Sequence, residues 1–71
     1  MANEFQERWA YDPNGRLEYY GQSEPGTHES EEKWMIEKYS YSGIQNATKK
    51  YPNGSNANVF AWSKRANYRY R

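Results

Sequence analysis

The chain has 71 residues, of which 35% are hydrophobic and 27% charged, with a net charge of +1, so it can form one small domain over residues 1–71 and no second core. It contains no cysteine and one histidine, which excludes disulfides, thiol chemistry and cysteine-ligated zinc, and we expect no metal and no cofactor. No stretch approaches the roughly 20 apolar residues that span a bilayer, and the first residues form no signal or transit peptide, so we expect a soluble protein without membrane contact.

The core must be built largely from aromatic rings. Leu, Ile, Val and Phe together occupy six positions, whereas Phe, Trp and Tyr together occupy thirteen. Each ring can bury roughly 150 to 250 Å², which compensates for the few aliphatic side chains. Because a chain of this size is only marginally stable alone, partners are the expected source of additional stability.

The first predicted element is a β-hairpin. Residues 5–11 alternate aromatic with polar or small side chains, the period of two that a half-buried strand requires. The sequence DPNG at residues 12–15 predicts a type I turn followed by a left-handed glycine, with Asp12 opposite Arg16.

This turn sets the expected pairing of the two hairpin strands. A three-residue loop places Tyr11 opposite Leu17 and Trp9 opposite Tyr19, within a second strand over residues 16–22. We therefore expect these four side chains to share one face and to contact each other across the strands.

The next elements are a turn over residues 24–27, a polar loop to residue 32 and a third strand over residues 34–41. Within that strand, Trp34 and Ile36 are out of phase with the tyrosines at positions 39 and 41. A β-bulge near residue 37 or 38 would bring both pairs to one face.

The C-terminal half contains weaker signals. Residues 42–43 predict a turn, residues 44–51 a short polar strand, and residues 51–54 a second Pro-Asn-Gly turn. Residues 59–62 fit one turn of helix as well as a strand. Residues 65–71 alternate again and predict a terminal strand.

The predicted fold class is all-β, a small antiparallel sheet or open barrel of about five strands with an aromatic core. The expected core residues are Trp9, Tyr19, Trp34, Ile36, Val59 and Trp62, with Tyr11 and Leu17 beside them.

The charge is distributed unevenly along the chain. Residues 1–37 carry nine acids and three bases, a net −6, whereas residues 38–71 carry seven bases and no acid, a net +7. Three interpretations remain open: the two halves neutralise each other through cross-strand ion pairs, the acidic part of one copy packs against the basic part of another, or the basic segment meets nucleic acid.

Catalytic and metal-binding patterns are weak. His28 lies among glutamates in a polar loop, where a surface histidine is ordinarily solvated. Glu18 with Glu24 or Glu37 could form a glycosidase-like carboxylate pair, but nine acids create such pairs by chance. With no nucleophile motif and no phosphate-binding loop, we expect no enzymatic activity.

The candidate partner-binding residues are the cations of the C-terminal segment, which alternate with alanine and tyrosine and should be exposed on one face of the terminal strand. They are Lys64, Arg65, Arg69 and Arg71.

Two segments resemble a small β-rich module of tailed bacteriophages. The sequence SEPGT at residues 23–27, followed by KWMIEKYSY at 33–41, is similar to the Glu-Pro-Gly-Thr turn and the Trp-x-Ile strand of that module. The match continues more loosely over residues 59–68, where the module has a tryptophan, an arginine shortly after it and a later tyrosine. Asn and Lys replace the acidic residues that the module tends to keep there.

This resemblance implies a virion structural or accessory protein, without catalytic residues, that is made in the cytoplasm of the bacterial host. It would act in repeated copies at the capsid surface, neck or tail, with other virion proteins and copies of itself as partners. The alternatives are a small nucleic-acid-binding module that uses the basic C-terminal strand and a phage effector directed at a host protein.

Overall fold

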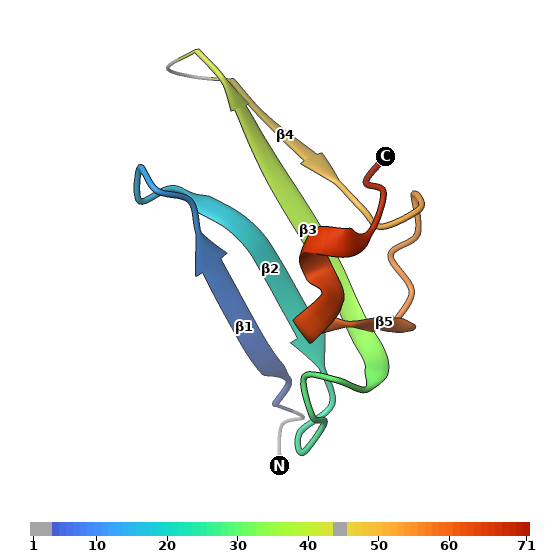
Figure 1. Ribbon diagram of the computed structural model, residues 1–71. Helices are drawn as coiled ribbons and strands as arrows, with labels where there is room; N and C mark the ends of the chain where they lie inside the picture. Colours follow the sequence, from blue (N-terminus) through green and yellow to red (C-terminus); the bar gives the residue numbers. More distant parts are fainter. Residues whose placement is uncertain (1–3, 44–45) are drawn as a thin grey trace.

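The computed structural model describes residues 4–43 and 46–71 as an open antiparallel sheet with a 3-10 helix across one face (Figure 1). The sheet order is β1-β2-β3-β4, and β5 pairs with β3 outside this path. Because β1 and β4 are edge strands, the sheet does not close into a barrel. The elements are β1 (Gln6–Tyr11), β2 (Leu17–Ser23), β3 (Glu32–Ser42), β4 (Asn46–Lys50), β5 (Phe60–Ala61) and the 3-10 helix η1 (Trp62–Asn67).

The turn between β1 and β2 has the predicted bulged type I geometry. Gly15 adopts a φ of 80°, and its N–H donates to the carbonyl of Asp12 at 2.9 Å. The Asp12 carboxylate accepts the backbone N–H groups of Arg16 and Asn14, both at 2.9 Å. These hydrogen bonds, led by that from Arg16, hold the pKa of Asp12 below its usual range.

The predicted partner of Tyr11 is confirmed, but that of Trp9 is wrong. Tyr11 pairs with Leu17, whereas Ala10 pairs with Tyr19 and Trp9 with Tyr20, because the register shifts between Ala10 and Tyr11. One extra residue in β2 moves every later side chain of that strand to the other face. Tyr19 therefore enters the core, while Trp9 does not.

The expected bulge in the third strand is also wrong. Between Met35 and Ser42, β3 pairs in continuous register with β2 and then with β4, and its register shift lies earlier, between Glu32 and Trp34. Trp34 and Ile36 are buried, whereas Tyr39 and Tyr41 lie on the opposite face. The two phases in the sequence reflect two faces of one regular strand.

The C-terminal segment differs most from the prediction of a terminal strand. After β5, residues Trp62–Asn67 form η1, and the last residues run beside residues 51–53 through an isolated bridge between Tyr70 and Pro52 and the backbone hydrogen bonds of Arg69 and Arg71. In Figure 1, η1 lies in front of β2 and β3. Residues 59–62 are thus divided between an exposed Val59, β5 and the start of the helix. Residues 44 and 45 of the predicted fourth strand lie outside the described residues.

The core lies between the sheet and η1. Its buried side chains are Tyr19, Trp34, Ile36, Phe60 and Trp62, so four of the expected core residues are confirmed and Phe60 was missed. Trp9, Tyr11 and Val59 are 52%, 63% and 55% exposed, which corrects their assignment to the core. Leu17 is half-buried.

The Trp62 ring lies directly on the backbone of Gly21. A Cβ atom added at Gly21 would lie 2.6 Å from Cε3 of Trp62 and 3.3 Å from Cε3 of Trp34. The centroids of the two tryptophan rings are 6.1 Å apart, and the Trp34 indole N–H donates to the carbonyl of His28 at 2.9 Å. This close approach requires glycine at position 21.

We predict that Gly21→Ala lowers the free energy of unfolding by about 1 to 3 kcal/mol, because the new methyl group overlaps the Trp62 ring. Urea unfolding checks this value. The control is Gln22→Ala, one position along β2 on the opposite face, which should change the stability by less than about 0.5 kcal/mol. Equal stability of the two variants would contradict the close packing.

We predict that Gly15→Val lowers the free energy of unfolding by about 1 kcal/mol or more, because a β-branched residue is strained at positive φ. Gly15→Asn is the matched control, since asparagine tolerates the left-handed region, and it should lose less. Thermal melts compare the two variants. If valine and asparagine behave alike, the backbone of the turn does not require the left-handed conformation.

Candidate functional site

The sheet face opposite η1 carries a row of large side chains, and no described helix or strand packs across it. Cross-strand pairing places Trp9 with Tyr20, Tyr20 with Glu37, and Tyr39 with Lys49 on this face. We call it the open face. Its apolar and aromatic members are Trp9, Tyr11, Leu17, Tyr20, Met35, Tyr39 and Tyr41, and its charged members are Glu7, Glu37 and Lys49.

Tyrosine hydroxyls hold the rings of the open face through hydrogen bonds, two of them to a neighbouring strand and one within β3. Tyr20 donates to the Glu7 carboxylate, and Tyr39 donates to Glu37 at 2.6 Å. Tyr41 donates to the carbonyl of Leu17 at 2.7 Å. Each bond fixes a ring before any partner arrives, so little side-chain freedom remains to be lost on binding.

The tyrosine at position 41 also joins the two halves of the sheet. The β2–β3 pairing covers only four residue pairs, from Tyr19 with Lys38 to Gln22 with Met35, and the two hairpins diverge above it in Figure 1. The Arg16 guanidinium lies 4.6 Å from the centroid of the Tyr41 ring. This cation–π contact and the hydroxyl bond to Leu17 hold the hairpins together where backbone pairing has ended.

Trp9 and Tyr11 are the parts of the open face most accessible to a partner. Both come from the edge strand β1 and are more than half exposed, and the Trp9 ring lies 5.9 Å from that of Tyr20. Large aromatic side chains that remain exposed on a preformed surface are typical anchors of protein interfaces. Sequence analysis did not predict this surface, because the alternation of residues 5–11 was interpreted as a strand whose aromatic side chains face the core.

Burial and the hydrogen bond to Glu7 raise the pKa of Tyr20 to about 12. Burial, followed by the bond to Glu37, likewise raises the pKa of Tyr39. Both phenols therefore stay protonated at neutral pH, as hydrogen-bond donors. They serve to orient the face and have no lowered pKa that would make them nucleophiles or bases.

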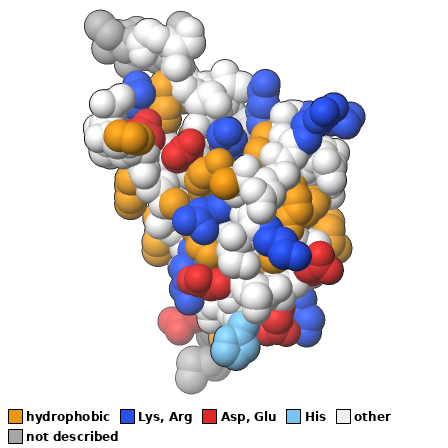
Figure 2. Space-filling model, in the orientation of Figure 1, with side chains coloured by type: hydrophobic (Ala, Val, Ile, Leu, Met, Phe, Trp, Pro, Cys, Tyr) orange, Lys and Arg blue, Asp and Glu red, His pale blue; other side chains and the backbone are white. Residues whose placement is uncertain are grey.

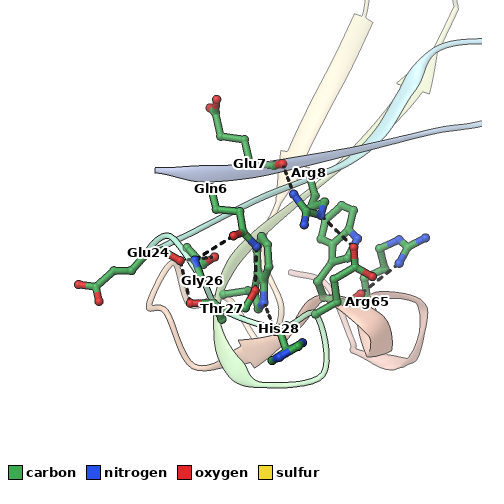
Figure 3. Close-up of polar contacts among 12 residues, drawn as sticks. Gln6, Glu7, Arg8, Glu24, Gly26, Thr27, His28 and Arg65 are labelled. Atoms are coloured by element: carbon green, nitrogen blue, oxygen red, sulfur yellow. Dashed lines mark hydrogen bonds and ion pairs between the residues drawn. The ribbon is translucent and has the colours of Figure 1, made fainter. Parts of the chain in front are cut away.

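The loop between β2 and β3 contains the predicted histidine–glutamate cluster, and its polar groups are paired locally (Figure 3). Gln6 donates to the carbonyl of Thr27 at 2.8 Å and accepts the N–H of Gly26 at 3.1 Å. Arg8 forms an ion pair with Glu29 at 2.9 Å. These bonds attach the loop to β1, and no group of three metal-ligating side chains occurs within residues 4–43 and 46–71.

The predicted partner-binding residues do not share the face of a terminal strand. Arg65 lies in η1 with its guanidinium 4.6 Å from the Trp62 ring centroid, and it donates to the carbonyl of Trp62. Lys64, Arg69 and Arg71 are exposed. The structure thus gives Arg65 a packing role over the core and leaves the other three cations free to meet a partner.

Ion pairing between the two halves of the chain is slight. Lys49 and Glu37 form a pair at 3.7 Å, whereas the other three ion pairs among the described residues join residues of the first half. Neutralisation of the halves through cross-strand ion pairs is therefore wrong beyond this one pair. The two parts touch through the backbone, where Ser63 of η1 donates to the carbonyl of Glu29 at 2.9 Å, but among the described residues their charges are mostly not paired with each other.

Comparisons with models of known protein families, with curated proteins and with solved structures gave no match to this chain. None of the helices in the described part of the chain is long and apolar enough to cross a membrane.

We predict that Glu7→Gln lowers the pKa of Tyr20 from about 12, because it removes the negative charge that opposes ionisation of the phenol. The raised pKa stabilises the fold at pH values below 10, and this contribution is lost as the pH rises from about 10 to about 12. Carbon NMR titration of the Tyr20 ring measures the shift. An unchanged pKa would contradict coupling between the two groups.

Proposed function

We propose that the protein is a non-enzymatic structural or accessory component of a bacteriophage particle, which packs against neighbouring virion proteins through its open face. The carrying observation is that this face presents Trp9 and Tyr11 on a sheet whose other face already holds the core. This chain needs aromatic rings for its core, yet two rings remain exposed side by side on the open face. Such exposed rings indicate a surface that a partner covers.

The composition of the open face supports a protein partner. Two of its carboxylates, Glu7 and Glu37, accept hydrogen bonds from tyrosines of the same face. Phosphate groups placed on this surface would be repelled by these charges, which argues against a platform for nucleic acid. Aromatic rings with a few fixed polar groups instead match the usual make-up of protein interfaces.

The assignment to a bacteriophage particle is supported by the resemblance of residues 23–27 and 33–41 to the tailed-phage module. In the structure, the first segment begins the loop after β2 and the second lies within β3. The proposed location is the virion, at the capsid surface, neck or tail. Packing into an array would also stabilise a small domain by mass action.

Mass spectrometry of purified, washed particles tests this function directly. We expect the protein in a fixed, multiple copy number per particle. Its absence from washed particles, together with its presence in infected cells bound to a host protein, would instead support the alternative of a phage effector.

We predict that the double variant Trp9→Thr/Tyr11→Thr is lost from particles while remaining folded, since both side chains are more than half exposed and threonine suits a strand. The control is Val59→Thr, which changes an equally exposed hydrophobic residue outside the open face. Particles assembled with each variant are analysed by mass spectrometry, and circular dichroism checks folding. Normal incorporation of the double variant would refute the role of the open face.

A further inference from the structure

Five cations gather where β3, β4, η1 and the C-terminal segment meet. Backbone hydrogen bonds join Tyr51 to Arg71 in both directions and Asn53 to Arg69, which places the C-terminal segment beside the end of β4. Lys38 pairs with Lys50 across the strands. We call this group the basic rim: Lys38, Lys50, Arg65, Arg69 and Arg71.

Two cations of the basic rim lie over aromatic rings of the core side of the sheet. The Lys38 ammonium lies 5.6 Å from the centroid of Tyr19 and 5.5 Å from that of Tyr70, and the Arg65 guanidinium lies 5.8 Å from Tyr19. The cations cover these ring faces, so the rings are not available for stacking with bases. What the rim offers to a partner is positive charge.

No cation of the basic rim forms an ion pair with a carboxylate among the described residues. Arg69, Arg71 and Lys50 are exposed. Like charges held this close repel each other, and a bound anionic partner would relieve that repulsion. The rim is therefore a positively charged surface suited to an anionic partner, although the net charge of the whole chain is only +1.

The same molecule carries a complementary surface, formed by the loop after β2 and the first two residues of β3 (residues 24–33), which we call the acidic loop. It contains four glutamates and one lysine, a net −3, and Glu24 and Glu32 are exposed and outside the ion pairs of the described residues. Figure 2 shows the histidine and several acidic side chains toward the lower end, where some basic side chains also lie, and a group of basic side chains at the upper right.

Apart from η1, whose Ser63 N–H donates to the carbonyl of Glu29 at 2.9 Å, the basic rim lies too far from the acidic loop to neutralise it within one molecule. Glu32 and Lys38 stand six residues apart on the same strand, roughly 20 Å at the rise of a β-strand. This separation is more than twice the Debye length of roughly 8 Å at physiological salt. Contact between an acidic loop and the part of the rim around Lys38, which includes Lys50 and the C-terminal arginines, therefore requires a second copy.

We propose that the basic rim of one copy binds the acidic loop of the next, which gives a head-to-tail contact between identical subunits. Because two different surfaces meet, the contact is heterologous and produces a ring or an open chain of subunits. This inference rests on the proposed function as an assembly component and specifies which surfaces join one copy to another, while the open face meets other virion proteins.

Sedimentation velocity of the full chain over a concentration series tests the contact. We expect the mean sedimentation coefficient to rise with concentration at low salt and to return to the monomer value at high salt, because screening weakens the contact between charged surfaces. A monomer at low salt over the whole series would overturn the proposal.

Charge reversal on each surface provides the sharper test. Lys50→Glu/Arg69→Glu/Arg71→Glu changes the charge of the rim from +5 to −1, which makes both surfaces acidic. Glu24→Lys/Glu32→Lys changes the charge of the loop from −3 to +1, which makes both basic, so each variant alone should lose its self-association. An equimolar mixture should regain it, because each acidic surface then meets a basic one. Circular dichroism confirms that both variants fold, and failure of the mixture to associate would overturn the proposal.

Nucleic acid is the competing partner of the basic rim. If the wild-type chain stays monomeric but binds random single-stranded oligonucleotides, and Lys50→Glu/Arg69→Glu/Arg71→Glu abolishes that binding, the rim serves nucleic acid and the proposal is wrong. The proposed function fails separately. If the protein is present in particles but monomeric in solution, only the contact between rim and loop is contradicted. If it self-associates but is absent from particles, only the virion role is contradicted.

Discussion

The packing of the Trp62 ring on the backbone of Gly21 determines how the rest of the chain is arranged. Because glycine has no side chain to separate the ring from the backbone, only the Trp62 ring lies between η1 and the sheet at this point. Trp34 contacts the same ring from β3, and Arg65 covers its outer side. A chain with so few aliphatic residues gains its core by placing rings against bare backbone and against each other. The close approach makes glycine at position 21 as necessary as either tryptophan.

This packing uses one face of the sheet and leaves the other without a covering layer. In a larger protein a second layer of helices or strands would cover the open face, but the described part of this chain provides one short helix and two residues of β5. Hydrogen bonds from Tyr20, Tyr39 and Tyr41 then serve to hold the uncovered rings in place. The open face thus remains uncovered because the described part of the chain provides no second layer, and it is the basis of the proposed assembly role.

Charge separation follows from the same topology. Antiparallel pairing of β1 with β2 and of β3 with β4 joins segments that are near in sequence, so acidic segments mostly pair with acidic ones. Within residues 4–43 and 46–71, Glu37 is the one carboxylate that forms an ion pair with a lysine of β4. The C-terminal segment lies against residues 51–53 and adds further cations to that side. Most charges of the two parts of the chain are therefore not paired with each other among the described residues, and the proposed head-to-tail contact would pair them between copies.

The sequence by itself determined those features that depend on local chemistry. The DPNG turn, the strands of both hairpins and the burial of Trp34, Ile36 and Trp62 follow from turn residues and ring content, which act over a few positions. The face of the sheet on which each ring lies was decided by the strand pairing. One extra residue in β2 places Trp9 and Tyr19 on opposite faces, although the turn alone predicted the same face. The C-terminal segment was likewise decided at long range. Residues 65–71 alternate like a strand, but residues 65–67 belong to η1 and only the last residues are extended, beside residues 51–53. Burial of the Trp62 ring against Gly21 outweighs the weak local preference of residues 65–67 for extended structure.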